Sequence, residues 1–109
     1  MEQPASSTDG ERHLANWRDE IDSAALYRAL ADLEPDARLA DLYRRLAATE
    51  DKHAGFWEER LRASGAQVPE RRVGWRARVL IALARRFGTQ TVLPTLNDLE
   101  RADSSGYEG

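Results

Sequence analysis

The sequence predicts an all-α protein, and three observations support that prediction. Apolar residues recur at steps of three and four, the spacing that places side chains on one face of a helix. In the middle of the chain this stripe consists of Leu39, Leu42, Tyr43, Leu46, Trp57 and Leu61. An earlier segment has the same spacing, and Glu34-Pro35-Asp36 forms a short break between the two. We therefore expect an antiparallel helical hairpin over about residues 11–64.

Composition restricts the classes of function. The chain has 109 residues, with 16 Lys+Arg against 19 Asp+Glu and a formal net charge of −3. It therefore predicts one small domain that is not basic enough to suggest nucleic-acid binding. The absence of cysteine excludes disulfides, thiolate metal sites and cysteine nucleophiles. The sequence shows neither an export signal nor a run of roughly 20 apolar residues, so a cytoplasmic location is expected.

The first helix is expected from Glu11 to Asp32, after a polar tail over residues 1–10 that we expect to be disordered. The predicted buried side of this helix consists of Leu14, Trp17, Ile21, Ala24 and Leu30. Glu20 adjoins that side, with His13 seven residues before it and Tyr27 seven residues after it. Two helical turns separate such residues, so these three lie along nearly one line.

The second helix is expected from Pro35 to about Ser64, with Gly65 ending it. Within it, Glu50 and His53 fall on the apolar stripe and should face the core. Polar groups are retained in a core only when something satisfies them. A carboxylate and an imidazole one helical turn apart offer two ligand atoms to one point, so this spacing suggests a metal ion.

Two further helices are expected in the rest of the chain. Residues 71–86 contain six arginines and no acid, in an amphipathic pattern. We favour a helix that covers the hairpin with solvated arginines; the alternative is a helix on an anionic membrane surface. Phe87-Gly88 breaks this segment, and a last helix is expected to begin within Thr89–Thr91. That helix carries Glu100 and is incomplete where the sequence stops.

The two ends of the chain share a spacing. Glu20 is followed seven residues later by Tyr27, and Glu100 is followed seven residues later by Tyr107. This match suggests that the first helix recurs as the last. A complete second half would place another Glu-x-x-His beyond residue 109. Either the chain belongs to a longer protein, or two copies pair and bring two half-sites together.

Glu20 on one helix, Glu50-x-x-His53 on the next and Glu100 on a later one resemble the ligands of a ferritin-like or rubrerythrin-like carboxylate di-iron bundle. In that family two helices each give a Glu, and the other two each give a Glu-x-x-His. Three of those four elements are present here.

The segments 16–30 and 43–54 resemble two branches of that family more closely. One is the ferritin-like domain fused to a vacuolar-iron-transporter-type membrane domain, called membrane-bound ferritin. The other is the encapsulated ferritins, whose chains each supply half a site. The resemblance covers about residues 11–109. The partners it implies are a homodimer or higher homo-oligomer, a membrane iron-transporter domain at the inner face of a membrane, or an encapsulating shell.

The resemblance also implies roles for individual residues. Glu50 bridges two irons, Glu20 and His53 bind terminally, and Glu100 takes the part of Glu20 for the second half of the site. The implied reaction is that of a ferroxidase, which oxidises Fe(II) to Fe(III) with dioxygen or peroxide for iron storage, detoxification or export. Manganese or zinc are the alternative metals. Tyr27 hydrogen-bonds a ligand or supplies an electron.

Metal-free interpretations stay open for each of these residues. Glu50 and His53 can form an ordinary intrahelical pair. Tyr27 is more simply explained as core packing, and His13 and Asp22 as solvated surface residues. The alternative function is therefore a metal-free helical module that mediates oligomerisation or docks on a membrane.

Overall fold

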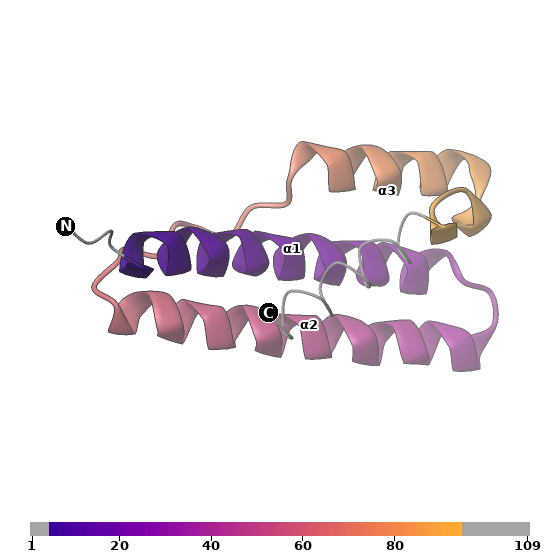
Figure 1. The fold of residues 1–109 in the computed structure, drawn as a ribbon. Helices are drawn as coiled ribbons and strands as arrows, with labels where there is room; N and C mark the ends of the chain where they lie inside the picture. Colours follow the sequence, from indigo (N-terminus) through magenta and orange to yellow (C-terminus); the bar gives the residue numbers. More distant parts are fainter. Residues whose placement is uncertain (1–4, 95–109) are drawn as a thin grey trace.

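The computed structural model describes residues 5–94. Over that range the chain forms three α-helices, α1 (Ala5–Leu33), α2 (Ala37–Ala63) and α3 (Trp75–Phe87), followed by a short 3-10 helix, η1 (Thr89–Thr91). No strand occurs among these residues, so the all-α prediction is confirmed. Helices α1 and α2 form the antiparallel hairpin, and α3 packs on the opposite side of α1 (Figure 1). Helix α1 is therefore the central element.

Helix α1 begins earlier than the sequence suggested. We expected a disordered tail over residues 1–10, but the chain is helical from Ala5 onward. The first residues of the helix are small or polar and include no proline. Extending an existing helix by one residue costs far less than starting one, so a buried helix can continue into a polar segment.

Helix α2 is capped at both ends. The side chain of Asp36 accepts a hydrogen bond from the Arg38 N–H at 3.0 Å, so Asp36 is the N-cap. Pro35 thus precedes the cap instead of occupying the first helical turn as predicted. At the other end Gly65 has φ +87°, and its N–H binds the Arg62 carbonyl at 2.9 Å. Only glycine adopts this left-handed conformation without strain, which fixes the predicted helix end.

Helix α3 is shorter than the basic segment from which it was predicted. Residues 65–74 form a connector beside α1, and the Gly74 N–H donates to the Asp22 carboxylate at 2.8 Å. Helix α3 therefore starts at Trp75 instead of Arg71. The expected last helix opens as the 3-10 turn η1, with Leu93 and Pro94 helical after it. Glu100 and Tyr107 lie outside the described residues.

The interface between α1 and α2 follows alternating steps of three and four residues. Among the buried residues of α1, five follow this alternation: Trp17, Glu20, Ala24, Tyr27 and Ala31. The buried positions on α2 are Ala40, Tyr43, Ala47, Glu50, Ala54, Trp57 and Leu61. This alternation is the seam of paired helices, and both glutamates occupy seam positions. Alanine alternates with large rings, so the helices approach closely while the rings fill the space between them.

The seam differs from the stripe that the sequence predicted for α2. Leu42 is 46% exposed, and Leu39 and Leu46 are only partly buried. The buried set instead includes an alanine every seven residues, at Ala40 and Ala47 and again one heptad later. Leu39 and Leu46 each lie one position before one of these alanines and Leu42 lies one position before Tyr43, so these three leucines flank the seam, whereas Leu61 belongs to it.

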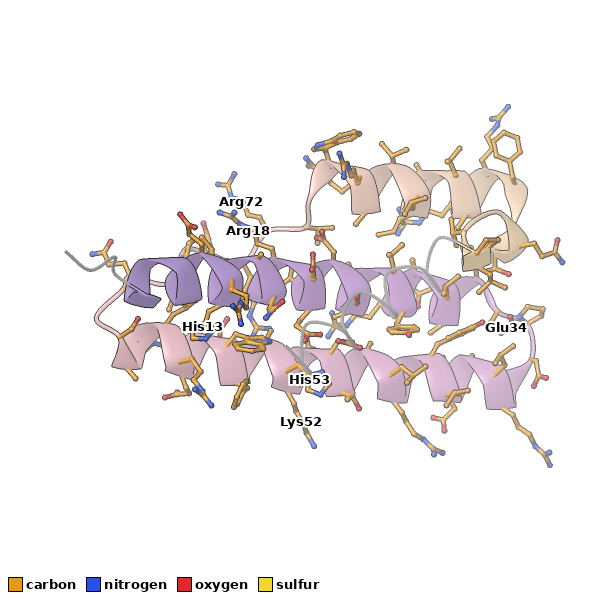
Figure 2. All side chains as sticks on the ribbon, in the orientation of Figure 1. His13, Arg18, Glu34, Lys52, His53 and Arg72 are labelled. Atoms are coloured by element: carbon orange, nitrogen blue, oxygen red, sulfur yellow. The ribbon has the colours of Figure 1, made fainter. Side chains whose placement is uncertain are left out.

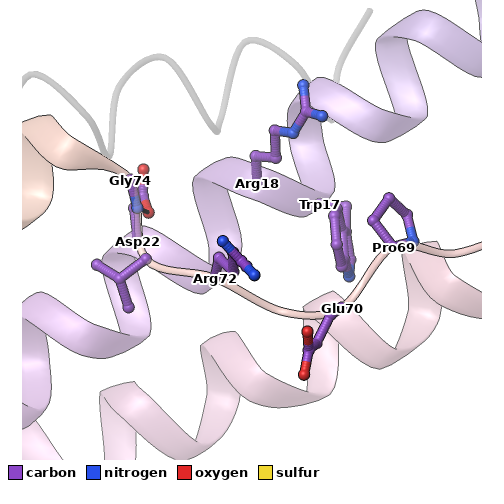
Figure 3. A pocket seen from close by; sticks show the side chains of 8 residues that line it. Trp17, Arg18, Asp22, Pro69, Glu70, Arg72 and Gly74 are labelled. Atoms are coloured by element: carbon purple, nitrogen blue, oxygen red, sulfur yellow. Dashed lines mark hydrogen bonds between the residues drawn. The ribbon is translucent and has the colours of Figure 1, made fainter.

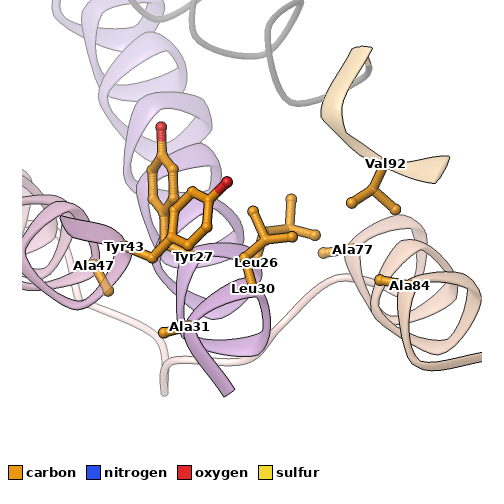
Figure 4. Close-up of a cluster of buried hydrophobic side chains, with 9 residues drawn as sticks. All are labelled: Leu26, Tyr27, Leu30, Ala31, Tyr43, Ala47, Ala77, Ala84 and Val92. Atoms are coloured by element: carbon orange, nitrogen blue, oxygen red, sulfur yellow. The ribbon is translucent and has the colours of Figure 1, made fainter. Parts of the chain in front are cut away.

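Two apolar clusters lie along the hairpin. The larger cluster, shown in Figure 4, contains Leu26, Tyr27, Leu30, Ala31, Tyr43, Ala47, Ala77, Ala84 and Val92. The smaller cluster contains Trp17, Ile21, Ala54 and Trp57. Along α2, Glu50 falls between the two clusters, and along α1, Glu20 falls between Trp17 and Ile21 of the smaller one. Both glutamates are near the middle of their helices.

The helices form an elongated slab of 56 × 25 × 19 Å. Across residues 5–94, no helix combines the length and apolar character that crossing a membrane requires.

Candidate metal centre

Glu20, Glu50 and His53 meet at the centre of the hairpin. Glu20 comes from α1, and the other two come from successive turns of α2. Each offers one ligand atom, and these atoms all lie within 4.8 Å of one another. The Nδ1 atom of His53 is 3.5 Å from Glu20 Oε1 and 3.5 Å from Glu50 Oε1. The structure thus brings together three of the four metal ligands proposed from the sequence; Glu100 is beyond the described residues.

The three side chains differ in their access to solvent. Glu20 is 1% exposed and Glu50 is 6% exposed, whereas the His53 side chain is 40% exposed. The carboxylates therefore lie in the interior and the imidazole lies at the rim, on the α2 side of the slab (Figure 2). Two carboxylates this close in a low-dielectric interior repel each other when both are ionised. A cation between them removes that repulsion.

The spacing of the three groups suits a metal ion. Carboxylate oxygens and imidazole nitrogens bind zinc at about 2.0–2.2 Å, so neighbouring ligand atoms around such an ion lie roughly 3–3.5 Å apart. The two 3.5 Å separations are at the upper end of that range. Protonated His53 between the two carboxylates would form an ion triad with the same spacing.

Trp57 contacts the cluster directly. Its indole Nε1–H donates to Glu20 Oε2 at 3.4 Å, while the other carboxylate oxygen, Oε1, faces His53. The two oxygens of Glu20 therefore have different neighbours. Sequence reasoning placed Trp57 in the core and missed this contact. The available signal was its position four residues after His53, which puts both side chains on one face of α2.

His13 is not the solvated residue that the sequence suggested. It is partly buried, and its ring centroid lies 5.2 Å from that of Trp57, with 32° between the ring planes. Its position seven residues before Glu20 places it on the same face of α1.

Tyr27 belongs to the apolar core. It is 6% exposed, and its ring lies 6.3 Å from that of Tyr43, with an interplanar angle of 25°. Seven residues separate Tyr27 from Glu20, which is roughly 10 Å along a helix. These contacts support the packing interpretation of Tyr27. Its proposed redox role stays a prediction.

Two further acids of α1 lie close to the cluster. Burial raises the pKa of Asp19, and the negative charges of Asp22 and Glu20 raise it further. Burial also raises the pKa of Asp22, although the hydrogen bond from Gly74 works in the opposite direction. Asp22 is thus a half-buried structural anchor, contrary to the expectation of a solvated side chain.

A second network ties the connector to the hairpin. The Trp17 indole donates to Glu58 Oε2 at 2.9 Å. Arg71 donates to both oxygens of the same carboxylate, from Nε at 2.7 Å and from Nη2 at 3.2 Å. These hydrogen bonds from Arg71 are the main reason that the pKa of the Glu58 carboxyl lies below its usual value. The sequence offers no short-range signal for these contacts, because they join distant segments.

A cavity of about 500 Å³ opens between α1 and the connector (Figure 3). Its charged lining residues are Arg18, Asp22, Glu70 and Arg72. Two positive and two negative side chains favour neither sign of ligand charge. Glu20, Glu50 and His53 do not line this cavity, so it is separate from the candidate metal centre.

Comparison of the chain with protein-family models, with curated proteins and with solved structures gave no match. The case for a functional site therefore depends on the residues themselves. Within the part of the chain that the structure describes, Glu20, Glu50 and His53 are the one group of three or more metal-ligating side chains with this mutual spacing.

Proposed function

We propose that this protein binds Fe(II) through Glu20, Glu50 and His53 and oxidises it to Fe(III), with dioxygen or peroxide as the electron acceptor. The observation that carries the proposal is the convergence of two buried carboxylates and one half-exposed imidazole on a single point. Carboxylate and imidazole together are ligands that suit iron. The resemblance to ferritin-like di-iron proteins, seen in the Glu20 and Glu50-x-x-His53 pattern, favours iron over zinc or manganese.

The proposed roles of the three residues follow from how deeply each is buried. Glu20 and Glu50 supply negative charge, which stabilises the ferric product more than the ferrous substrate because the attraction grows with the charge of the ion. His53 lies at the rim, where an incoming ion first meets the site. Three protein ligands leave coordination positions free for the oxidant. Iron is the substrate, and its electrons pass to dioxygen or peroxide, which also takes up protons.

The described residues of one chain supply half of the ligands of a four-helix di-iron site. They contribute one Glu from α1 and one Glu-x-x-His from α2, whereas the complete set has two of each. We propose that a second copy provides the other half across a two-fold axis, so that Glu50 of each chain bridges the two irons. The exposed side of His53 is the side on which the site is open to such a partner.

Metal binding tests the proposal without depending on catalysis. The metal-free protein is loaded anaerobically with Fe(II), and bound iron per chain is measured together with the melting temperature. We expect about one iron per chain. The native state should gain about 2.7 kcal/mol when free iron is a hundredfold above its dissociation constant. Admission of air should then produce ferric absorbance.

Variants of α2 separate a specific site from general carboxylate binding. Glu50→Gln and His53→Ala should each abolish stoichiometric iron binding, the melting shift and oxidation. Glu59→Gln is the matched control, because Glu59 is an exposed carboxylate on the same helix, paired with Arg62. His53 is exposed enough that its truncation should leave the helical circular dichroism unchanged. Unaltered iron binding in both Glu50→Gln and His53→Ala would defeat the proposal.

A further inference from the structure

The outward face of α3 exposes large apolar side chains. Trp75 and Phe87 are each 65% exposed, and Val79 between them is 48% exposed. They occur at the start, middle and end of the helix, so the apolar surface extends along its whole length. Ala77 and Ala84 are the buried residues of α3, on the side toward α1. Helix α3 thus covers the hairpin as predicted, but it also leaves an apolar surface uncovered.

Arginines share this exposed surface. Arg76, Arg78, Arg85 and Arg86 are all exposed, and none of them forms a salt bridge with another residue in the range 5–94. Two of them lie over aromatic rings instead. The Arg76 guanidinium is 5.3 Å from the centroid of the Trp75 ring, and the Arg86 guanidinium is 5.7 Å from that of Phe87. The surface therefore carries uncompensated positive charge on a chain whose net charge is −3.

We propose that α3 docks this protein on the surface of an anionic lipid bilayer. Trp75, Val79 and Phe87 insert among the lipid headgroups, and the four arginines contact lipid phosphates and carboxylates. Tryptophan is favoured at this depth because its ring is apolar while its N–H can bond to headgroups. Arginine stems can cover apolar surface while their charged ends remain hydrated. An amphipathic helix rich in Arg and aromatic residues lies in the plane of such an interface.

The mixing of charge and apolar surface favours lipid over a protein groove. Arg86 comes eleven residues after Trp75, close to three full turns, so the guanidinium and the indole lie on nearly the same line of the helix. A dry groove that accepted Trp75 would also have to desolvate Arg86, which is unfavourable without a buried partner. The headgroup layer accommodates both groups within a few ångströms of depth.

This surface is independent of the candidate metal centre. Helices α3 and α2 lie on opposite sides of α1 (Figure 1). Docking through α3 therefore leaves the α2 side, with the rim residue His53, facing away from the bilayer. Neither the proposed iron chemistry nor the pairing of two copies is required for membrane binding, and the two proposals can fail separately.

Vesicle co-sedimentation of the full chain tests the proposal. We expect binding to vesicles of phosphatidylcholine mixed with phosphatidylserine, weakening as salt is added, and little binding to phosphatidylcholine alone. Each arginine near an anionic surface contributes about fivefold to affinity, so Arg76→Gln with Arg86→Gln should reduce binding roughly 25-fold. Both side chains are exposed, so the fold should be retained.

Helix α2 offers a matched control. Arg44 and Arg60 are exposed there, and Arg60 lies 5.0 Å from the ring centroid of Phe56, which is 46% exposed. Arg44→Gln with Arg60→Gln removes the same charge and one similar cation–aromatic contact from a different face. This variant should bind vesicles within about twofold of the unmodified chain. An equal loss in both double variants would assign binding to net charge and overturn the proposal.

Tryptophan fluorescence reports insertion directly. Trp17 and Trp57 are buried, so a shift to shorter wavelength on adding anionic vesicles should come from Trp75. Trp75→Phe should abolish most of the shift. Three results would overturn the proposal: no binding to anionic vesicles, binding without a Trp75 shift, or a dimer in lipid-free solution that Arg76→Gln with Arg86→Gln dissociates. The last would identify a second copy as the occupant of this surface.

Discussion

The indole of Trp57 restricts how Glu20 can bind an ion. Its N–H donates to Glu20 Oε2, which leaves Oε1 directed at His53. A carboxylate held in this way presents one oxygen to a metal in a fixed orientation. Groups that orient a ligand without touching the metal affect affinity by about tenfold to a hundredfold when they are replaced. Trp57 acts as a positioning residue in this proposal, because it contacts Glu20 and not the ion.

We therefore predict that Trp57→Phe weakens metal binding about tenfold while keeping the stoichiometry. Isothermal titration with Co(II) measures the affinity, and the cobalt absorption spectrum should change because the orientation of Glu20 is no longer fixed. Trp17→Phe is the matched control, since Trp17 is also buried and donates its indole N–H to a glutamate, Glu58, outside the metal centre. Equal weakening in both variants would show a general effect of core packing instead.

Where a polar side chain interrupted an apolar period, sequence reasoning was right for Glu50 and only partly right for His53. Glu50 is buried as expected, whereas the His53 side chain, also expected to face the core, is 40% exposed. Sequence reasoning failed where the decisive contact was between elements. His13 and Asp22 are partly buried because Trp57 and the Gly74 amide lie against them, and no local pattern shows either neighbour.

At the scale of elements, a hydrogen-bonded network centred on Glu58 holds the connector between α2 and α3 against the hairpin. Glu58 accepts from both Trp17 and Arg71, so it joins α1, α2 and the connector. The Arg71 side chain is 40% exposed, which allows solvent to screen its interaction with Glu58. The lowered pKa of Glu58 nevertheless makes the stability of this region depend on pH.

The sign of that dependence follows from proton linkage. Because the folded pKa of Glu58 is below its unfolded value, its contribution to stability is present above about pH 4.3 and is lost as the pH falls through the folded pKa. We predict that Glu58→Gln lowers the free energy of unfolding at neutral pH. The substitution should also reduce the further loss of unfolding free energy that occurs as the pH falls from neutral to about 3.

Urea denaturation of the metal-free protein at both pH values measures this effect. Asp19 and Asp22 have raised pKa values, so their contributions have the opposite sign, but they are common to both proteins and cancel in the comparison. Glu59→Gln is the control, because the Glu59 side chain is 78% exposed. A Glu58→Gln protein whose pH dependence matches that of the unmodified chain would contradict the assignment.

The positions of the helices could be predicted from the sequence, whereas the residues on their buried faces were predicted less well. The turn at Glu34-Pro35-Asp36 and the stop at Gly65 are local signals, and both mark real ends of helices. On α2 the predicted residues Tyr43, Trp57 and Leu61 are buried, but alanines at 40, 47 and 54 take the buried positions expected of Leu39, Leu42 and Leu46. Hydrophobicity alone favours leucine for burial, whereas close approach of two helices carrying Tyr and Trp requires small residues opposite them. That requirement depends on the partner helix.

At the scale of the whole molecule, the described residues of one chain present half of a di-iron ligand set. If two copies complete the site, metal should drive association, because ions bound between the chains stabilise only the paired state. We predict that sedimentation analysis shows a monomer without metal at low concentration and twice that mass after anaerobic addition of Fe(II).

Charge neutralisation is the physical reason for this prediction, because four buried carboxylates facing one another repel until cations are present. His53→Ala should stay monomeric with iron, and Glu59→Gln should dimerise normally. A stable dimer in the His53→Ala protein under both conditions would show that pairing does not depend on the metal. Iron binding by a protein that stays monomeric would retain the site but reject its completion by a second copy.

The position of His53 has a consequence for any ion that a single chain holds. Its side chain is 40% exposed, so one side of the candidate metal centre is open to water in the single chain. A residue such as His53, already at the rim, then leaves an ion within reach of small chelators. Iron bound by a single chain should accordingly exchange quickly, and pairing with a second copy on the His53 side should slow that exchange.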